Sequence, residues 1–419
     1  MQLITAVLLI LYIIIINRHK NIIRPDVVFT IVLLSTLFIT GLRLSSNQNY
    51  YKPWFYLMVY MTIFLFSVSE RLVLKYRGVN EIEEDLRFEE MEPYDPHTMR
   101  IIVFILWTLV ILSFVITVVV LGAPPALSLQ SDRETYYLGF WGAFFSLNSV
   151  LYSLILFDRY QIQAIDRKLS EFYSITLYCT VFLFANKFQI FTLILIFIVM
   201  RGILVKGQKI RSLIILVAVA ILIFTILYNT VYLKMYNFSV NDTLKWYNMK
   251  LPKEFGFIAN PYLYIANNFD NLYTFISMKP SRMYGYNGVY NITRSKELCE
   301  FIFTPSISAR SKDFSGSMRL GAMNTGSIFL HPYWDFGIAG VFIYAVFCGA
   351  LCGFIERKLV ENKDFMSCFA YCYAMIGVFA SFFTDAFLSK SMLINLLAAA
   401  IISAILHEKI VFMFRGKRI

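Results

Sequence analysis

Long apolar runs recur along the whole chain and constrain its fold more than any other feature. Bilayer hydrocarbon is about 30 Å thick, so a helix needs roughly 20 apolar residues to cross it. Inside lipid every backbone amide must be hydrogen-bonded within the protein, which leaves α-helices and closed barrels. Barrel strands would alternate apolar and polar residues over segments of about ten residues, a pattern that this sequence lacks. The sequence therefore predicts an all-α polytopic membrane protein.

Composition and the number of runs refine this prediction. Of 419 residues, 58% are hydrophobic and 16% are charged, whereas about a quarter are charged in soluble domains, so a water-soluble fold is excluded. We expect about eleven transmembrane helices. They lie near residues 2–17, 27–42, 54–69, 100–121, 137–157, 170–186, 188–201, 212–233, 334–354, 365–384 and 391–407.

The basic residues predict how the chain crosses the membrane. The formal net charge is +11, and Lys and Arg collect in alternate connectors, as cytoplasmic loops do. These residues are Arg18, Lys20 and Arg24; Arg159, Arg167 and Lys168; Arg201, Lys206, Lys209 and Arg211; Arg357, Lys358 and Lys363; and the tail residues Lys409, Arg415, Lys417 and Arg418. With eleven spans, this parity places the C-terminus in the cytoplasm and the N-terminus outside.

Three regions follow from that topology. Residues 1–233 form an N-terminal bundle of about eight spans with a cytoplasmic loop at 70–99, and residues 334–419 form three spans and a cytoplasmic tail. Between them, residues 234–333 form one large external, periplasmic loop, rich in aromatic residues and so unlike a disordered linker. Within it, Asn260–Ile276 has the spacing of an amphipathic helix lying at the membrane surface.

The long loop is cationic although it is predicted to be external. It carries eleven basic and six acidic residues, against the bias that keeps positive charge inside. One explanation is an anionic ligand. The alternative is that long loops are translocated regardless of their charge.

Cysteines and familiar motifs exclude several classes of site. Five of the six cysteines lie in apolar segments and Cys299 stands alone, so no disulfide framework is predicted. The pairs Cys348/Cys352 and Cys368/Cys372 are interpreted as small residues between helices rather than as metal ligands. The sequence contains no Walker loop, glycine-rich nucleotide fingerprint or HExxH motif. We therefore expect no cofactor, no metal and no use of cytoplasmic ATP.

Charged residues at the predicted external helix ends are the candidates for binding. They are Arg133, Lys187, Asp335, Asp385 and Lys390. Charges at a membrane boundary mark substrate paths, although a single charge there can also snorkel to the interface.

The order of several short motifs resembles a known family. The motifs are Gly122-Ala-Pro-Pro before an Arg-containing loop, Lys187 in a tight turn, Asn260-Pro-Tyr-Leu-Tyr in the large loop, and Tyr333-Trp-Asp-Phe-Gly337 entering a glycine-rich helix. This layout resembles the Wzy-type polymerases of O-antigen and capsule repeat units, and more broadly the lipid-linked, GT-C-like glycosyltransferases and O-antigen ligases.

The resemblance implies a glycosyltransferase of the bacterial inner membrane. Such an enzyme joins oligosaccharide repeat units carried on undecaprenyl pyrophosphate into surface polysaccharide, for lipopolysaccharide or capsule, and releases undecaprenyl pyrophosphate at the outer face. The implied partners are the lipid-linked oligosaccharide, membrane lipids, and a chain-length regulator and flippase of the same pathway. No nucleic acid is implied.

That chemistry selects candidate residues. Arginine pairs two oxygens of a diphosphate and stays protonated. The candidate diphosphate-binding residues are Arg133, Lys187, Arg282, Arg294, Arg310 and Arg319, of which we prefer Arg294 and Arg319. The catalytic candidates are His331 and Asp335, which lie one helical turn apart and can contact each other. A helix-capping role for Asp335 is equally compatible with the sequence.

Three alternatives stay open. An O-antigen ligase would place a loop histidine near an arginine. A polysaccharide flippase or secondary transporter would show an inverted repeat and ionisable residues within its helices; the predicted spans contain few, and we find no repeat. A membrane acyltransferase would show a histidine-rich site, but the chain has only four histidines.

Overall fold

The structure is a computed structural model. It describes residues 1–19, 24–76, 94–128, 136, 138–205, 225, 239–304, 307 and 325–407. Several predicted features lie outside these residues, namely Arg133, Arg310, Arg319, most of the predicted loop 70–99, the predicted span 212–233 and the basic tail.

The regular elements among the described residues are all helical, and the one β-contact there is an isolated bridge between Ser45 and Met249. Five helical segments are long and apolar enough to cross a membrane. They are α3 (Pro53–Lys75), α4 (Pro96–Leu121), the run Gly139–Ile162, α9 (Lys187–Leu204) and α17 (Leu330–Asn362). The run comprises α6 (Gly139–Phe145), α7 (Asn148–Phe157) and a π-helical turn (Asp158–Ile162). This confirms a helical membrane protein, while the count of eleven spans stays a prediction.

Other predicted spans correspond to shorter helices. They are α1 (Gln2–His19), α2 (Pro25–Gly41), α8 (Arg167–Leu183), α18 (Phe365–Ala380) and α19 (Lys390–Leu406). Several boundaries follow from local sequence. Proline occupies the first turn of α2, α3 and α4, where its missing N–H is not needed. Asp95, Asn186 and Asp364 cap α4, α9 and α18 with their side chains.

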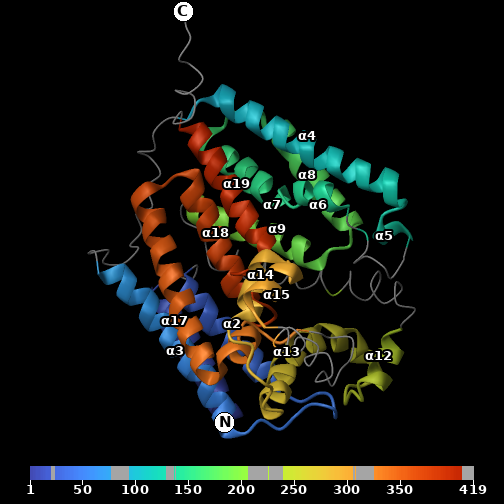
Figure 1. The fold of residues 1–419 in the computed structure, drawn as a ribbon, viewed down its shortest axis with the longest axis vertical. Helices are drawn as coiled ribbons and strands as arrows, with labels where there is room; N and C mark the ends of the chain where they lie inside the picture. The colour runs from blue at the N-terminus through green and yellow to red at the C-terminus, as the bar shows by residue number, and fades with distance from the viewer. Residues whose placement is uncertain are drawn as a thin grey trace, which may run out of the picture.

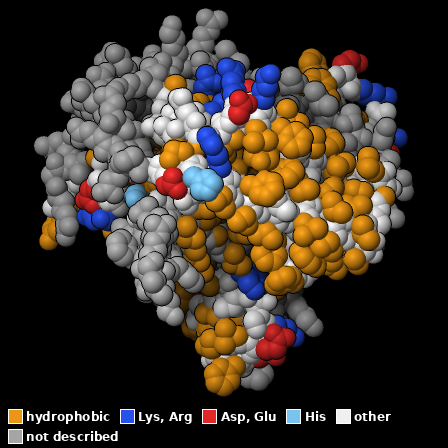
Figure 2. Space-filling view, turned by 90° about the horizontal axis from the view of Figure 1, so that it is seen from above, with side chains coloured by type: hydrophobic (Ala, Val, Ile, Leu, Met, Phe, Trp, Pro, Cys, Tyr) orange, Lys and Arg blue, Asp and Glu red, His pale blue; other side chains and the backbone are white. Residues whose placement is uncertain are grey.

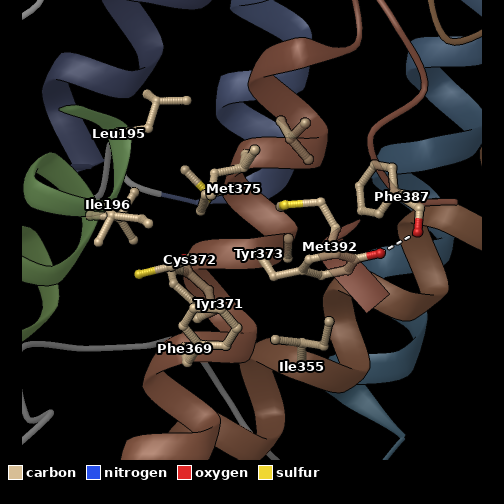
Figure 3. Close-up of a cluster of buried hydrophobic side chains, with 14 of the residues drawn as sticks. Leu195, Ile196, Ile355, Phe369, Tyr371, Cys372, Tyr373, Met375, Phe387 and Met392 are labelled. Atoms are coloured by element: carbon tan, nitrogen blue, oxygen red, sulfur yellow. Dashed lines mark hydrogen bonds between the residues drawn. The ribbon is translucent and has the colours of Figure 1, made fainter. Parts of the chain in front are cut away.

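The helices form two groups joined through α18. In Figure 1, α1, α2, α3 and α17 lie on one side, and α4, α6, α7 and α8 lie at the end near the C-terminus. Helix α18 contacts α2, α9, α17 and α19, so it packs between the groups. Figure 3 shows its side chains Tyr371 and Met375 among Leu195 and Ile196 of α9 and Met392 of α19.

The outer faces of α4 and α8 are apolar. Phe104 and Val119 of α4 are 56% and 77% exposed, and Ile175 of α8 is 61% exposed. Figure 2 looks onto the end of the molecule where α4 lies and shows a wide hydrophobic area with charged side chains at its borders. Exposed apolar patches of this kind mark a contact with lipid or protein, which agrees with a membrane protein.

Helices α3 and α17 approach closely at two glycines. A Cβ atom at Gly349 would lie 2.2 Å from Ser69 Oγ and 2.3 Å from the carbonyl oxygen of Phe66, and one at Gly353 would lie 2.6 Å from the carbonyl oxygen of Glu70. Small residues four apart let membrane helices pack backbone to backbone. The motif Gly349-Ala-Leu-Cys-Gly353 therefore fixes how α17 lies on α3.

Replacing Gly349 with alanine is expected to destabilise the protein by about 1–3 kcal/mol, the usual effect of overpacking. The added methyl group must push α3 away, because one of its contacts is backbone. Thermal unfolding of the purified full-length protein in detergent measures this. Gly288→Ala is the matched control, since nothing lies within 4 Å of its Cβ position. Equal melting temperatures for the two variants would contradict the prediction.

The described part of the predicted external loop includes several helical segments before α17. They are α12 (Val240–Trp246), a 3-10 helix (Lys253–Ile258), α13 (Ala259–Ser277), α14 (Tyr286–Thr293) and α15 (Lys296–Ile302). Helix α13 confirms the helix predicted over 260–276. It does not rest on the molecule by one face, because most of its side chains are buried. The buried Asp270 accepts hydrogen bonds from Asn49, and the Tyr262 hydroxyl donates to Gln48, so α13 is fastened to the connection between α2 and α3.

Candidate functional site

A kink in α17 organises the site. Gly337 has φ 72° and ψ −153°, a conformation that only glycine adopts readily. It ends the predicted Tyr333-Trp-Asp-Phe-Gly337 motif. A segment of the long loop lies against the turn before the kink. Residues 282–284 donate hydrogen bonds to the carbonyl oxygens of residues 333–335, at 2.8, 3.1 and 3.2 Å. The loop is thereby fixed to the membrane helix by three consecutive hydrogen bonds.

Arg282 is the first of these donors and has a structural position. Its Nη1 donates to the Tyr333 carbonyl oxygen, and its guanidinium carbon lies 4.7 Å from the centroid of the Tyr333 ring. A Cβ atom at Gly337 would come within 2.8 Å of its Nη2. Arg282 therefore fills the space that the missing side chain of Gly337 leaves.

Asp335 caps the following loop helix. Its carboxylate is 4% exposed and accepts from the backbone N–H of Asn287 at 3.3 Å, the Asn287 Nδ2 at 2.8 Å and the backbone N–H of Gly288 at 3.3 Å. Those amides belong to the first turn of α14, where a negative charge is favourable. The sequence left open whether Asp335 caps a helix. It does cap one, but that helix is α14 and not α17, to which Asp335 itself belongs.

His331 contacts the same helix one turn later. Its Nδ1 lies 2.7 Å from Asn291 Nδ2. An amide nitrogen only donates, so with this amide orientation Nδ1 accepts and Nε2 carries the proton of the neutral ring. His331 and Asp335 make no direct hydrogen bond among the described residues; each bonds an asparagine of α14 instead. The predicted contact between them is replaced by two parallel contacts between α14 and α17.

Arg294 lies beside His331 at the end of α14. It is the C-cap residue, in the left-handed conformation with φ 52°, and its side chain is exposed. Its guanidinium carbon is 5.5 Å from the centroid of the Tyr290 ring, and its charge interacts with His331. A cation at the C-terminal end of α14 therefore lies within electrostatic range of the imidazole.

The other predicted charges are placed elsewhere. Lys187 begins α9 and lies 5.6 Å from the ring centroid of Tyr264, which stacks on Phe383 in the turn between α18 and α19. Asp385, in that same turn, accepts a hydrogen bond from the Tyr344 hydroxyl at 2.7 Å, and burial raises the pKa of Asp385 to about 6. The structure thus binds Arg282 at Tyr333, between the two catalytic candidates in sequence, and places Arg294 within electrostatic range of His331. Lys187 lies elsewhere. Arg133, Arg310 and Arg319 lie outside the described residues.

Sequence reasoning missed Asn287 and Asn291. Both are buried, and their spacing of four matches the spacing of His331 and Asp335. Two polar pairs with the same spacing, one on each helix, are the sequence feature that could have predicted this contact between the helices. A second missed contact lies near the start of α17, where Asn271 of α13 donates to the Thr325 carbonyl oxygen at 2.9 Å.

The arrangement presents hydrogen-bond donors and a positive charge. No group of His, Cys, Asp or Glu that could hold a metal ion occurs within the described part of the chain. All six cysteines are free. Arg294 and the Nε2–H of His331 are hydrogen-bond donors, so the site can hold an anionic oxygen such as that of a phosphate group. No family model, curated protein or solved structure matches the chain.

Proposed function

We propose that the chain is a polymerase that joins undecaprenyl-pyrophosphate-linked repeat units into a surface polysaccharide at the outer face of the bacterial inner membrane. The observation that carries the proposal is the position of Arg294 within electrostatic range of His331, in the first turn of a helix that could cross the membrane. A diphosphate attached to a lipid lies at that depth of the bilayer. The cationic composition of the long loop and the motif order described above support the same function.

The proposed reaction needs charge stabilisation more than acid catalysis. The hydroxyl oxygen of the acceptor forms the new glycosidic bond, the bond between the anomeric carbon and the diphosphate oxygen breaks, and the hydroxyl proton leaves to solvent. Negative charge then develops on the departing undecaprenyl pyrophosphate. Arg294 and the Nε2–H of His331 stabilise it, because donors arranged in advance act where charge appears. In this tautomer the Nε2–H of His331 donates a hydrogen bond, so the catalytic candidate His331 acts as a donor and not as a base.

Asp335 and Arg282 act as positioning residues in this proposal. The carboxylate of Asp335 is already occupied by three N–H donors, and Arg282 is bound at the kink. Together they hold α14 on α17, which fixes the distance between Arg294 and His331. A displacement of about 1 Å can lower a rate by about 100-fold.

Arg294→Ala tests the proposal in a strain that lacks its own polymerase and expresses this chain. We expect polysaccharide of a single repeat unit at unchanged protein level, with about a 100-fold or larger loss of rate, as for removal of one charge-stabilising donor. Arg294→Lys keeps the charge but loses the two-pronged geometry, so chains of intermediate length are expected. Lys296→Ala is the control, because Lys296 forms only a surface ion pair with Glu300. Full-length polymer from Arg294→Ala would contradict the proposal.

An O-antigen ligase is the second candidate, because the pairing of a loop histidine with an arginine is the feature expected of it. The same strain distinguishes the two. If the chain is a polymerase, the wild-type chain restores polymer of many repeat units, whereas if it is a ligase, single repeat units remain even with the wild-type chain. Membrane extracts separated by length therefore decide between them.

A further inference from the structure

Three carboxyl groups are buried together at the other end of α17. Asp26 at the start of α2, Glu70 near the end of α3 and Glu356 near the end of α17 each have 0% of their surface exposed. Glu356 lies 19 residues beyond the Gly337 kink, or roughly 30 Å along a helix. This group, the carboxyl cluster, is therefore remote from the α14 site. It exists because Gly349 and Gly353 bring α17 close to the turn of α3 that carries Glu70.

Two arginines neutralise only part of the cluster. Arg71 donates through Nε and Nη2 to Asp26 Oδ2, at 3.1 and 2.9 Å. Arg24 Nε lies 3.6 Å from Asp26 Oδ1 and 3.6 Å from Glu356 Oε1, outside hydrogen-bonding distance. Both carboxyl oxygens of Glu70 and both of Glu356 are buried without a hydrogen-bond partner. Three ionised carboxylates facing two guanidinium groups would leave one negative charge uncompensated.

The two unpartnered carboxyl groups face each other. Glu70 and Glu356 interact electrostatically across the contact of α3 with α17, where a Cβ atom at Gly353 would lie 2.6 Å from the carbonyl oxygen of Glu70. Two ionised carboxylates can only accept and repel each other. If one of them is protonated, it donates to the other, and the same proton restores the charge balance of the cluster. A buried unpaired charge costs several kcal/mol, so the protonated arrangement is strongly favoured.

Among the residues that the structure describes, neighbouring elements offer no other positive charge to this pair. The further titratable groups that face the cluster are Tyr12 on α1, Tyr371 on α18 and Cys352 on α17. Phenol and thiol groups are uncharged near neutral pH. The cluster lies one side chain below the surface, because Arg71, which binds Asp26, is 58% exposed. Exchange of a proton with the solution is therefore expected along Arg71.

We propose that Glu70 and Glu356 form a binding site for one exchangeable proton, and that this proton holds α3 against α17. The ligand is a single positive charge shared by two carboxyl oxygens. Raising the pH removes it and leaves the negative charge buried between the two helices. The packing of α3 on α17 is thereby sensitive to the pH of the compartment that the Arg71 end faces.

Infrared spectroscopy of the purified full-length protein tests this site. We expect the wild type at pH 7 to show a carboxylic-acid carbonyl band that shifts in D2O. Glu70→Gln and Glu356→Gln should each remove the same band, because either change leaves two carboxylates for two arginines. Glu300→Gln is the control, since Glu300 lies on the surface and its replacement should leave the band intact. A band that persists in both single variants would overturn the proposal.

Thermal unfolding of the wild type tests the proposal even where a variant fails to fold. The melting temperature is expected to fall as the band disappears with rising pH. The bound proton stabilises the folded protein, and this stabilisation is lost when the proton dissociates at higher pH. A melting temperature that stays level while the band disappears would overturn the proposal. So would binding of one ²²Na⁺ per protein at pH 7 with no carboxylic-acid band, which would assign the site to sodium.

Discussion

Asp335→Ala is expected to abolish polymer formation and to destabilise the protein by about 3 kcal/mol, since each buried donor left without an acceptor costs about 1–3 kcal/mol. The Asp335 carboxylate is 4% exposed and accepts from three N–H groups at the start of α14. Without it α14 loses its cap and its main attachment to α17. Arg294 then moves away from His331. The loss of activity is therefore expected to be larger than the loss of folded protein can explain.

Two measurements check this prediction. Thermal unfolding in detergent gives the stability, and the length of surface polysaccharide gives the activity at matched protein level. Asp335→Asn keeps one acceptor oxygen and should lie between the wild type and Asp335→Ala. Asp166→Asn is the control, because Asp166 caps α8 in the same way but is exposed. Normal polymer from Asp335→Ala would show that α14 does not have to be held on α17.

Gly337→Ala is expected to produce the second large effect, a destabilisation of about 3 kcal/mol. At φ 72° and ψ −153° an alanine is strained, and such residues cost about 1–3 kcal/mol. Its Cβ would also lie 2.8 Å from Arg282 Nη2 and 3.0 Å from Arg282 Cζ. Arg282 must then leave the Tyr333 carbonyl oxygen to which it donates, which loosens the loop at the kink.

Gly122 provides a matched control for the energetic cost of placing alanine in this backbone conformation. It has φ 88° and ψ −159°, close to the conformation of Gly337, but nothing lies within 4 Å of its Cβ position. Gly122→Ala therefore measures the strain alone, and the excess effect of Gly337→Ala measures the contact with Arg282. Combining Gly337→Ala with Arg282→Ala should cost less than the two single changes added together. Strict additivity would contradict the assigned contact.

Local sequence patterns explain where several helices begin, although the predicted spans did not use them. The first residue of α2, α3 and α4 is proline, and capping residues precede α9 and α18. Helix α13 was predicted within one residue at each end. Helix α17 was predicted as 334–354 but runs from Leu330 to Asn362. Hydropathy marks only the apolar centre of a helix, so the polar turns at both ends were assigned to loops.

That error explains what the sequence missed. The predicted spans excluded Asp26, Glu70 and Glu356, each of which lies one or two residues outside a predicted boundary. All three are buried between helices, so the carboxyl cluster could not be recognised. Because these three carboxyl groups lie within helices, the scarcity of ionisable residues in the predicted spans is a weaker argument against a transporter.

The site was predicted only in part because its contacts are long-range. His331, Asp335 and Arg294 were chosen for their chemistry, and the structure places them together. Their partners Asn287 and Asn291 lie 40 or more residues away in sequence, and no periodicity connects the two helices. The geometry also changes the interpretation of Asp335, because a carboxylate saturated with N–H donors positions a helix and is poorly placed to accept a further proton.

The orientation of the α14 site is the central claim, and cysteine labelling tests it most directly. In a Cys179→Ser background, which removes the exposed native cysteine, single cysteines are placed at the exposed Lys296 of α15 and at Lys358 near the end of α17. Intact spheroplasts are then treated with a membrane-impermeant thiol reagent. The account predicts labelling of Lys296→Cys in intact cells, and of Lys358→Cys only after permeabilisation. The reverse pattern would place the Arg294 and His331 pair in the cytoplasm and contradict the proposed function.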